Sequence, residues 1–79
     1  PPATGPTAAE ARMARKELTR LETRLSRITA ERADLHARMA RAHADHLALA
    51  QLAATEGDLA REQDELEERW LELAATLEG

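Results

Sequence analysis

The 79-residue sequence contains no cysteine, phenylalanine or tyrosine, and its one aromatic residue is Trp70. Without cysteine it forms neither disulfides nor thiolate metal sites, which fits a reducing compartment. Apolar β-branched or aromatic bulk comes only from Ile28 and Trp70. A chain this short and this poor in bulk is not expected to enclose a substrate pocket, so a catalytic domain is disfavoured.

Long hydrophobic runs are also absent. No apolar stretch approaches the roughly 20 residues that a membrane-spanning helix needs, and no signal peptide is recognisable. We therefore expect no membrane partner. Because the chain opens with Pro1 rather than methionine, we also expect it to be a piece of a larger protein.

What the sequence does contain is a high content of helix-forming residues arranged in two heptad series. The first comprises Leu18, Leu21, Leu25, Ile28, Leu35, Met39 and Ala42, and the second comprises Leu49, Leu52, Leu59, Leu66, Trp70, Leu73 and Leu77. The two series are three residues out of phase, which indicates a turn between them. The predicted fold is all-α, a two-helix antiparallel coiled-coil hairpin. Its parts are a Pro-rich linker over residues 1–6, helix one at about 7–40, a turn at about 41–45 and helix two at about 46–77.

Capping residues support these helix ends. Thr7 precedes Glu10 by three residues, the capping-box spacing, in which both side chains accept hydrogen bonds from backbone amides. Asp45 is the best N-cap for the second helix. Gly57 is an alternative turn site, but the heptad phase continues across it. We interpret it as a weak point inside helix two, which costs roughly 1 kcal/mol relative to alanine.

Charges beside the seam select the helix register. In an antiparallel hairpin, facing residues have numbers with a constant sum, and the seams permit sums near 84 or 91. The larger sum brings like charges together at Glu22–Glu67, Glu31–Glu62 and Arg24–Arg69. The smaller sum pairs Glu17 with Arg69, Arg24 with Glu62 and Arg15 with Glu67, and sets Trp70 against Ala14. Because flanking charges set register in coiled coils, we predict the smaller sum.

Two charged residues, Arg32 and Glu56, occupy seam positions in neighbouring layers. The favoured interpretation is a mutually satisfied pair that fixes alignment at some cost in stability. The alternative is a hinge that lets the tip of the hairpin move.

No constellation in the sequence predicts catalysis or metal binding. His36, His43 and His46 lie near the proposed turn, but a zinc site needs four ordered ligands, and solvated histidines are favoured. The acidic run at residues 62–68 is expected on a solvated helix face, where nothing separates the pKa values of its carboxyl groups. No phosphate-binding loop or nucleophile–base arrangement is present.

Charge is divided unevenly between the halves of the chain. Residues 1–46 hold nine basic and six acidic side chains, whereas residues 47–79 hold two basic and nine acidic ones. Outward heptad positions of helix one carry Arg12, Lys16, Arg20, Arg27 and Arg41. This face is a candidate contact for nucleic-acid phosphates, with an ordinary solvated face as the alternative. Leu71 lies off the seam and is either a small docking patch or a single exposed leucine.

The segment Glu-Leu-Glu-Glu-Arg-Trp-Leu-Glu-Leu-Ala at residues 65–74 resembles the C-terminal coiled-coil domain of ABC-F ATPases of the Uup type. Further matches are Arg-Lys-Glu-Leu at 15–18, Leu-His at 35–36 with Met39, and Asp-His at 45–46. The resemblance covers about residues 10–78 and implies a hairpin appended to two ATPase domains. It also implies a cytoplasmic parent that binds ATP and Mg²⁺ and acts on the ribosome, in translation or antibiotic resistance, or on DNA.

From these features we expect an accessory arm that binds DNA or ribosomal RNA through its basic first helix and contacts the ATPase domains of the same polypeptide. The fragment itself is expected to hold no cofactor and to be no enzyme. The alternative is a structural or protein–protein coiled coil that self-associates, although a monomer is favoured.

Overall fold

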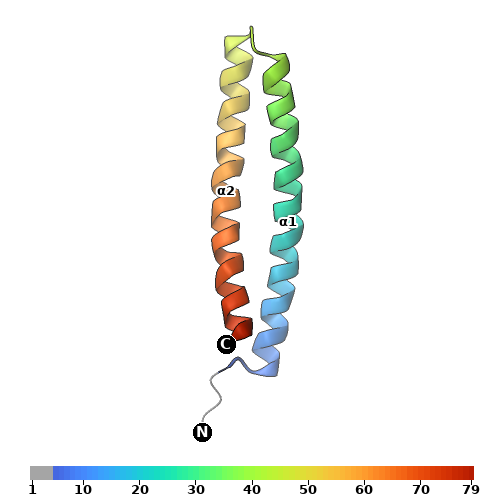
Figure 1. Cartoon of the computed structure of the whole chain (residues 1–79), viewed down its shortest axis with the longest axis vertical. Coiled ribbons are helices and arrows are strands. Elements are labelled where there is room, and N and C mark those ends of the chain that lie inside the picture. The colour runs from blue at the N-terminus through green and yellow to red at the C-terminus, as the bar shows by residue number, and fades with distance from the viewer. Residues whose placement is uncertain (1–4) are drawn as a thin grey trace.

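The structure is a computed structural model that describes residues 5–79 as two long helices side by side (Figure 1). Helix α1 spans Ala8–Arg41 and helix α2 spans His46–Glu78. At 1.5 Å per residue, each is about 50 Å long. The predicted all-α hairpin is therefore confirmed. Of the expected linker, only Gly5 and Pro6 lie within the described residues, and neither is helical.

Thr7 caps the N-terminus of α1. Its hydroxyl accepts a hydrogen bond from the Glu10 amide at 3.1 Å, as the sequence predicts. The second half of the capping box differs from the prediction, because the Glu10 carboxylate accepts from the Thr7 hydroxyl at 2.9 Å instead of from a backbone amide. The carboxylate nevertheless lies in the first turn of α1, where the helix dipole favours negative charge.

A tight turn over residues 42–45 reverses the chain. The Ala42 amide donates to the carbonyl groups of Arg38 and Met39, which closes the last turn of α1. Asp45 then caps α2, since its carboxylate accepts from the Ala48 amide at 3.0 Å. No residue in the described chain has a positive φ, so this turn needs no glycine.

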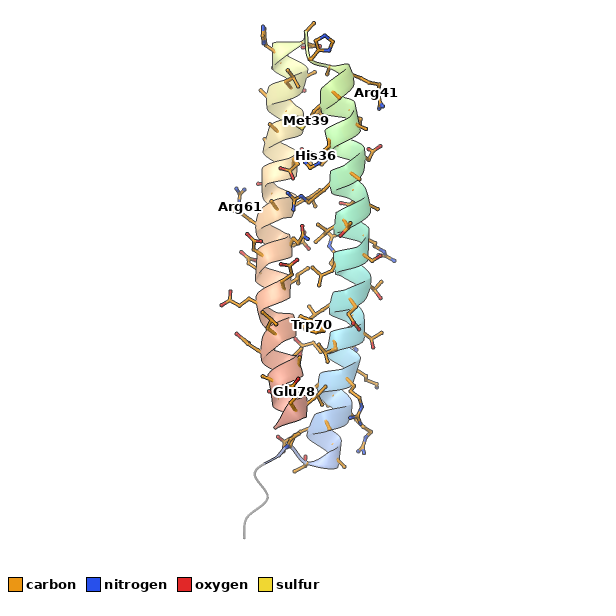
Figure 2. The ribbon with its side chains drawn as sticks, viewed as in Figure 1. His36, Met39, Arg41, Arg61, Trp70 and Glu78 are labelled. Atoms are coloured by element: carbon orange, nitrogen blue, oxygen red, sulfur yellow. The ribbon has the colours of Figure 1, made fainter. Side chains whose placement is uncertain are left out.

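The apolar core lies towards the open end of the hairpin, where the start of α1 lies beside the end of α2. Its buried members are Ala14, Leu21 and Leu73, and Leu18, Leu66, Trp70 and Leu77 pack against them. Trp70 lies between the two ribbons in Figure 2 and packs against this cluster. It also lines a hollow with Leu25, which is eleven residues further along α1 than Ala14, so the predicted pairing of Trp70 with Ala14 is not confirmed. Ile28 and Leu35 continue the buried stripe of α1 towards the tip.

Cross-helix ion pairs identify the register. Arg69 donates two hydrogen bonds to the Glu17 carboxylate, at 2.7 and 3.1 Å. Arg24 forms a bidentate pair with the Glu62 carboxylate, with both hydrogen bonds at 2.7 Å. The smaller sum predicts both pairs, but it does not describe the register as a whole. Towards the tip, Arg32 donates to Gln63 and His36 contacts Glu56, and the numbers of these pairs add to 95 and 92. A sum of 84 would set Gln63 beside Leu21, about 16 Å along α1 from Arg32. Facing residues therefore add to about 90, which is closer to the larger sum, and the predicted register is wrong. The third predicted pair is wrong, because Arg15 has no ion-pair partner among the described residues, and Glu67 accepts from Gln63 instead.

A polar layer, made of Arg32, Glu56 and Gln63, interrupts the apolar seam. The Arg32 guanidinium donates to the Glu56 carboxylate and the Gln63 side-chain oxygen, both at 2.5 Å. His36 lies at the edge of the layer, with its Nε2 3.3 Å from Glu56. The predicted satisfied pair is confirmed, and both helices continue through the layer without a break.

Helix α2 also runs continuously through Gly57, so the alternative turn at this residue is wrong. Neither helix has a segment that is both long and apolar enough to span a membrane, within the described residues.

Candidate nucleic-acid interface

The basic side chains fall into two groups. The paired group consists of Arg24, Arg32, Arg38, Arg61 and Arg69, each within 4.0 Å of a carboxylate. The second group consists of Arg12, Arg15, Lys16, Arg20, Arg27 and Arg41. None of these has an ion-pair partner in residues 5–79, and all are exposed on α1. The structure therefore leaves a set of uncompensated positive charges on one helix.

Heptad position explains most of this division. Arg24 flanks the seam and reaches across to Glu62, whereas Arg27 is three residues further along and points outward. The outward positions predicted for Arg12, Lys16, Arg20, Arg27 and Arg41 are all exposed. Their role as nucleic-acid contacts stays a prediction.

The outward residues are not evenly spaced along the rod. Arg12, Lys16 and Arg20 follow one another at about 6 Å intervals along the helix axis, and Arg27 lies about 10 Å further on. Arg41 lies about 20 Å beyond Arg27, at the tip, where it points away from α2 in Figure 2. The structure thus brings four of the predicted contacts together with Arg15 and leaves Arg41 apart. We call Arg12, Arg15, Lys16, Arg20 and Arg27 the basic surface.

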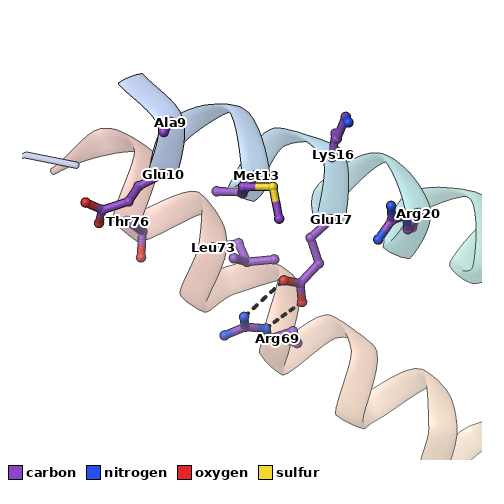
Figure 3. A pocket seen from close by; sticks show the side chains of 10 residues that line it. Ala9, Glu10, Met13, Lys16, Glu17, Arg20, Arg69, Leu73 and Thr76 are labelled. Atoms are coloured by element: carbon purple, nitrogen blue, oxygen red, sulfur yellow. Dashed lines mark hydrogen bonds and ion pairs between the residues drawn. The ribbon is translucent and has the colours of Figure 1, made fainter. Parts of the chain in front are cut away.

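A shallow groove of about 550 Å³ borders the basic surface. Met13 and Leu73 form its apolar part, and Lys16 and Arg20 stand at its rim (Figure 3). The Glu17–Arg69 pair crosses it from one helix to the other. The Arg69 hydrogen bonds hold the pKa of Glu17 below its ordinary value, which keeps this carboxylate charged and compensated.

Helix α2 presents the opposite charge. Its acidic side chains without an ion pair in the described chain are Asp64, Glu65, Glu67, Glu68 and Glu78, all exposed. They lie in the same half of the rod as the basic surface but on the other helix. The hairpin is therefore electrically polarised across its width, although its net charge is −4. A polyanion would be attracted to α1 and repelled by α2.

The other polar residues do not converge on a chemical site. Within residues 5–79, no group of three His, Asp or Glu side chains lies close enough together to hold a metal ion. His43 contacts the Ala40 carbonyl at 3.2 Å, and His46 begins α2. The acidic run predicted on a solvated face is mostly exposed, and Glu62 within it pairs with Arg24.

Three features of the site were not predicted from the sequence. Arg15 joins the basic surface because its expected partner Glu67 lies beside Leu25, ten residues further along α1. His36 adds itself to the polar layer, and the groove beside Met13 depends on how the helices pack. The helical spacing of His36 and Arg32, four residues apart, is the one signal that pointed to any of these contacts.

Comparison with known families identifies the chain. The profile of the ABC transporter C-terminal domain matches residues 10–75, which is most of the sequence. The chain belongs to this family. It is accordingly an accessory C-terminal domain of an ABC protein, a class that implies an ATPase in the parent. No curated protein and no solved structure matches the chain significantly.

Proposed function

We propose that this ABC transporter C-terminal domain is a nucleic-acid-binding arm of a cytoplasmic ABC-F protein of the Uup type. Its partner is DNA or ribosomal RNA, bound through the basic surface of α1. The ATPase domains of the parent, which bind ATP and Mg²⁺, are the arm's second partner. The observation that carries the proposal is the division of charge, in which every basic residue without an ion pair in residues 5–79 lies on α1.

Basic side chains with and without an ion pair differ in the free energy that they gain by binding a phosphate. Arg24 and Arg69 already donate to carboxylates, so a phosphate would have to replace those bonds. Arg12, Lys16 and Arg20 donate to no side chain or backbone group within residues 5–79, so no bond to those residues has to break when a phosphate binds. Release of counterions is the main driving force of sequence-independent binding.

The surface is suited to the backbone of a nucleic acid and not to its bases. Trp70 is the only aromatic side chain, and it is packed into the core between the helices. Stacking on bases therefore has no exposed aromatic platform. Contacts from arginine and lysine to phosphates position a protein without reading sequence. We expect binding that depends strongly on salt and weakly on sequence.

The proposal is tested by fluorescence polarisation with a DNA duplex and a ribosomal RNA helix at several salt concentrations. Replacing Arg12, Lys16 and Arg20 together by glutamine should weaken binding and reduce the slope of log K against log salt by about 3, close to one unit per lost phosphate contact. All three residues are exposed, so the fold should survive.

Arg61→Gln is the matched control, since Arg61 is exposed on α2 and pairs with Asp58. It should leave both affinity and slope nearly unchanged. The proposal is wrong if the wild-type chain fails to bind at low salt. It is also wrong if the triple variant and the control bind alike.

A further inference from the structure

Two large apolar side chains are exposed in the half of the rod that contains the apolar core. Met13 on α1 is 67% exposed and Leu71 on α2 is 63% exposed. Both side chains border the apolar core, since their sequence neighbours Ala14 and Trp70 belong to it. Leu47, the third exposed large apolar residue of the described chain, lies instead at the tip.

Met13 and Leu71 lie on opposite broad faces of the hairpin. Met13 lines the groove crossed by the Glu17–Arg69 pair. Leu71 lines a separate hollow of about 250 Å³ together with Leu25, Glu67 and Trp70, and the two hollows share no residue. Helix geometry gives the same answer, because Arg69 and Leu71 flank the inward-facing Trp70 on opposite sides.

Each apolar residue is bordered mainly by unpaired charge of one sign. The exception is Glu10, which also lines the Met13 groove and forms no ion pair within residues 5–79. Lys16 and Arg20 stand three and seven residues after Met13 and share its groove. Glu67 and Glu68 stand four and three residues before Leu71, and Asp64 stands seven before it. No ion pair within residues 5–79 neutralises any of these five side chains.

We propose that the Met13 face of one chain binds the Leu71 face of a second copy. The apolar side chains meet at the centre, with Lys16 and Arg20 facing the acidic residues around Leu71. Charge complementarity of this kind selects a partner and sets orientation. Two copies of the same face would instead bring like charges together, so a symmetric pairing is disfavoured.

Because the two faces differ, the contact is heterologous and leaves one face of each kind free at the ends of an assembly. The contact is small and charged, so it is weak and is reduced by salt. Lys16 and Arg20 also belong to the basic surface, so a bound nucleic acid competes for the Met13 face. The Leu71 face is not involved in that competition.

The absence of cysteine permits a direct test by disulfide trapping. Separately purified 79-residue chains carrying Met13→Cys and Leu71→Cys, one with a mass tag, are mixed under a glutathione redox buffer. The yield of the disulfide-linked mixed dimer should be severalfold higher than random pairing of the two variants would give. High salt should reduce this yield to the random value. Both positions are exposed, so the substitutions should leave the fold intact.

Mixing Met13→Cys with Leu47→Cys is the matched control, since Leu47 is 70% exposed but lies at the tip. This pair should give only the random share. An equal yield from the two mixtures would overturn the proposal, as would an excess of either symmetric dimer. The experiment contains no nucleic acid, so its outcome is independent of the binding test described above.

Discussion

At the scale of single residues, heptad position determines what each charged side chain does. Arg24 and Arg27 are three residues apart, yet the first is tied to Glu62 by two hydrogen bonds and the second has no ion-pair partner in residues 5–79. The same rule buries Ile28 completely, between those arginines and the polar layer. Side chains of identical chemistry therefore divide into structural and available groups according to the direction in which they leave the helix.

Gly57 is the residue at which local propensity and structure disagree most. It lies within α2, and a Cβ added there would meet nothing closer than the Arg61 guanidinium at 3.8 Å. Gly57→Ala should therefore raise the free energy of unfolding by about 0.5–1 kcal/mol, through reduced backbone entropy of the unfolded chain. Urea denaturation followed by circular dichroism measures the change.

Ala54→Gly, at an exposed position of the same helix, should lower the stability by a similar amount. If Gly57→Ala is neutral or destabilising, α2 is not a regular helix at this point.

At the scale of elements, the polar layer lowers the stability of the hairpin but fixes the alignment of α1 with α2. Arg32 and Glu56 are only 30% and 18% exposed, and the pair sits where a coiled coil would otherwise place leucine. A partly buried ion pair recovers its desolvation cost only through good geometry and additional hydrogen bonds. Here Gln63 and His36 supply the additional partners.

Removing one member of the pair should cost more than removing both. Glu56→Leu leaves the Arg32 guanidinium in the seam without a carboxylate, and Arg32→Leu leaves the carboxylate with His36 alone. We expect both single variants to be less stable than the wild type and the double variant to recover at least the larger loss. A double-mutant cycle by urea denaturation measures this coupling.

The exposed Arg61–Asp58 pair provides a comparison, since its side chains are 70% and 71% exposed and its coupling should be close to zero. Additive losses at Arg32 and Glu56 would mean that the layer is not coupled in solution.

At the scale of the whole molecule, ion pairs across the helices make stability depend on pH. Hydrogen bonds from Arg69, Arg32 and Arg24 lower the pKa of Glu17, Glu56 and Glu62, respectively, below the ordinary value of 4.5. A carboxyl group with a lower pKa in the folded state adds stability that is fully present above its unfolded pKa. That stability is lost as the pH falls through the folded pKa.

The melting temperature should therefore be nearly constant around neutral pH and should fall once the pH drops below about 5. Glu62→Gln should weaken this acid dependence, because it removes one of the shifted groups. Thermal melts by circular dichroism at constant ionic strength provide the measurement. Glu65→Gln is the control, since Glu65 is exposed and unpaired within residues 5–79. If Glu62→Gln and Glu65→Gln give the same pH profile, the Arg24–Glu62 pair does not contribute to stability.

The sequence by itself determined the hairpin, the turn and two of the cross-helix ion pairs, but not the register. Heptad spacing, a phase shift and the caps Thr7 and Asp45 are local signals, and each agrees with the final fold. The outward basic residues were also predictable, since helical periodicity alone assigns them to one face. In this respect the candidate interface required no knowledge of packing.

The tertiary structure alone decided which side chains meet across the helices. The register differs from the predicted one, Arg15 has no ion-pair partner within residues 5–79, His36 contacts Glu56, and Met13 and Leu71 line separate hollows. These outcomes depend on side-chain rotamers and on the relative placement of the two helices. The spacing of residues within one helix contains no information about either. Long flexible side chains choose among partners separated by fractions of a kcal/mol, so only the packed arrangement selects the contacts that form.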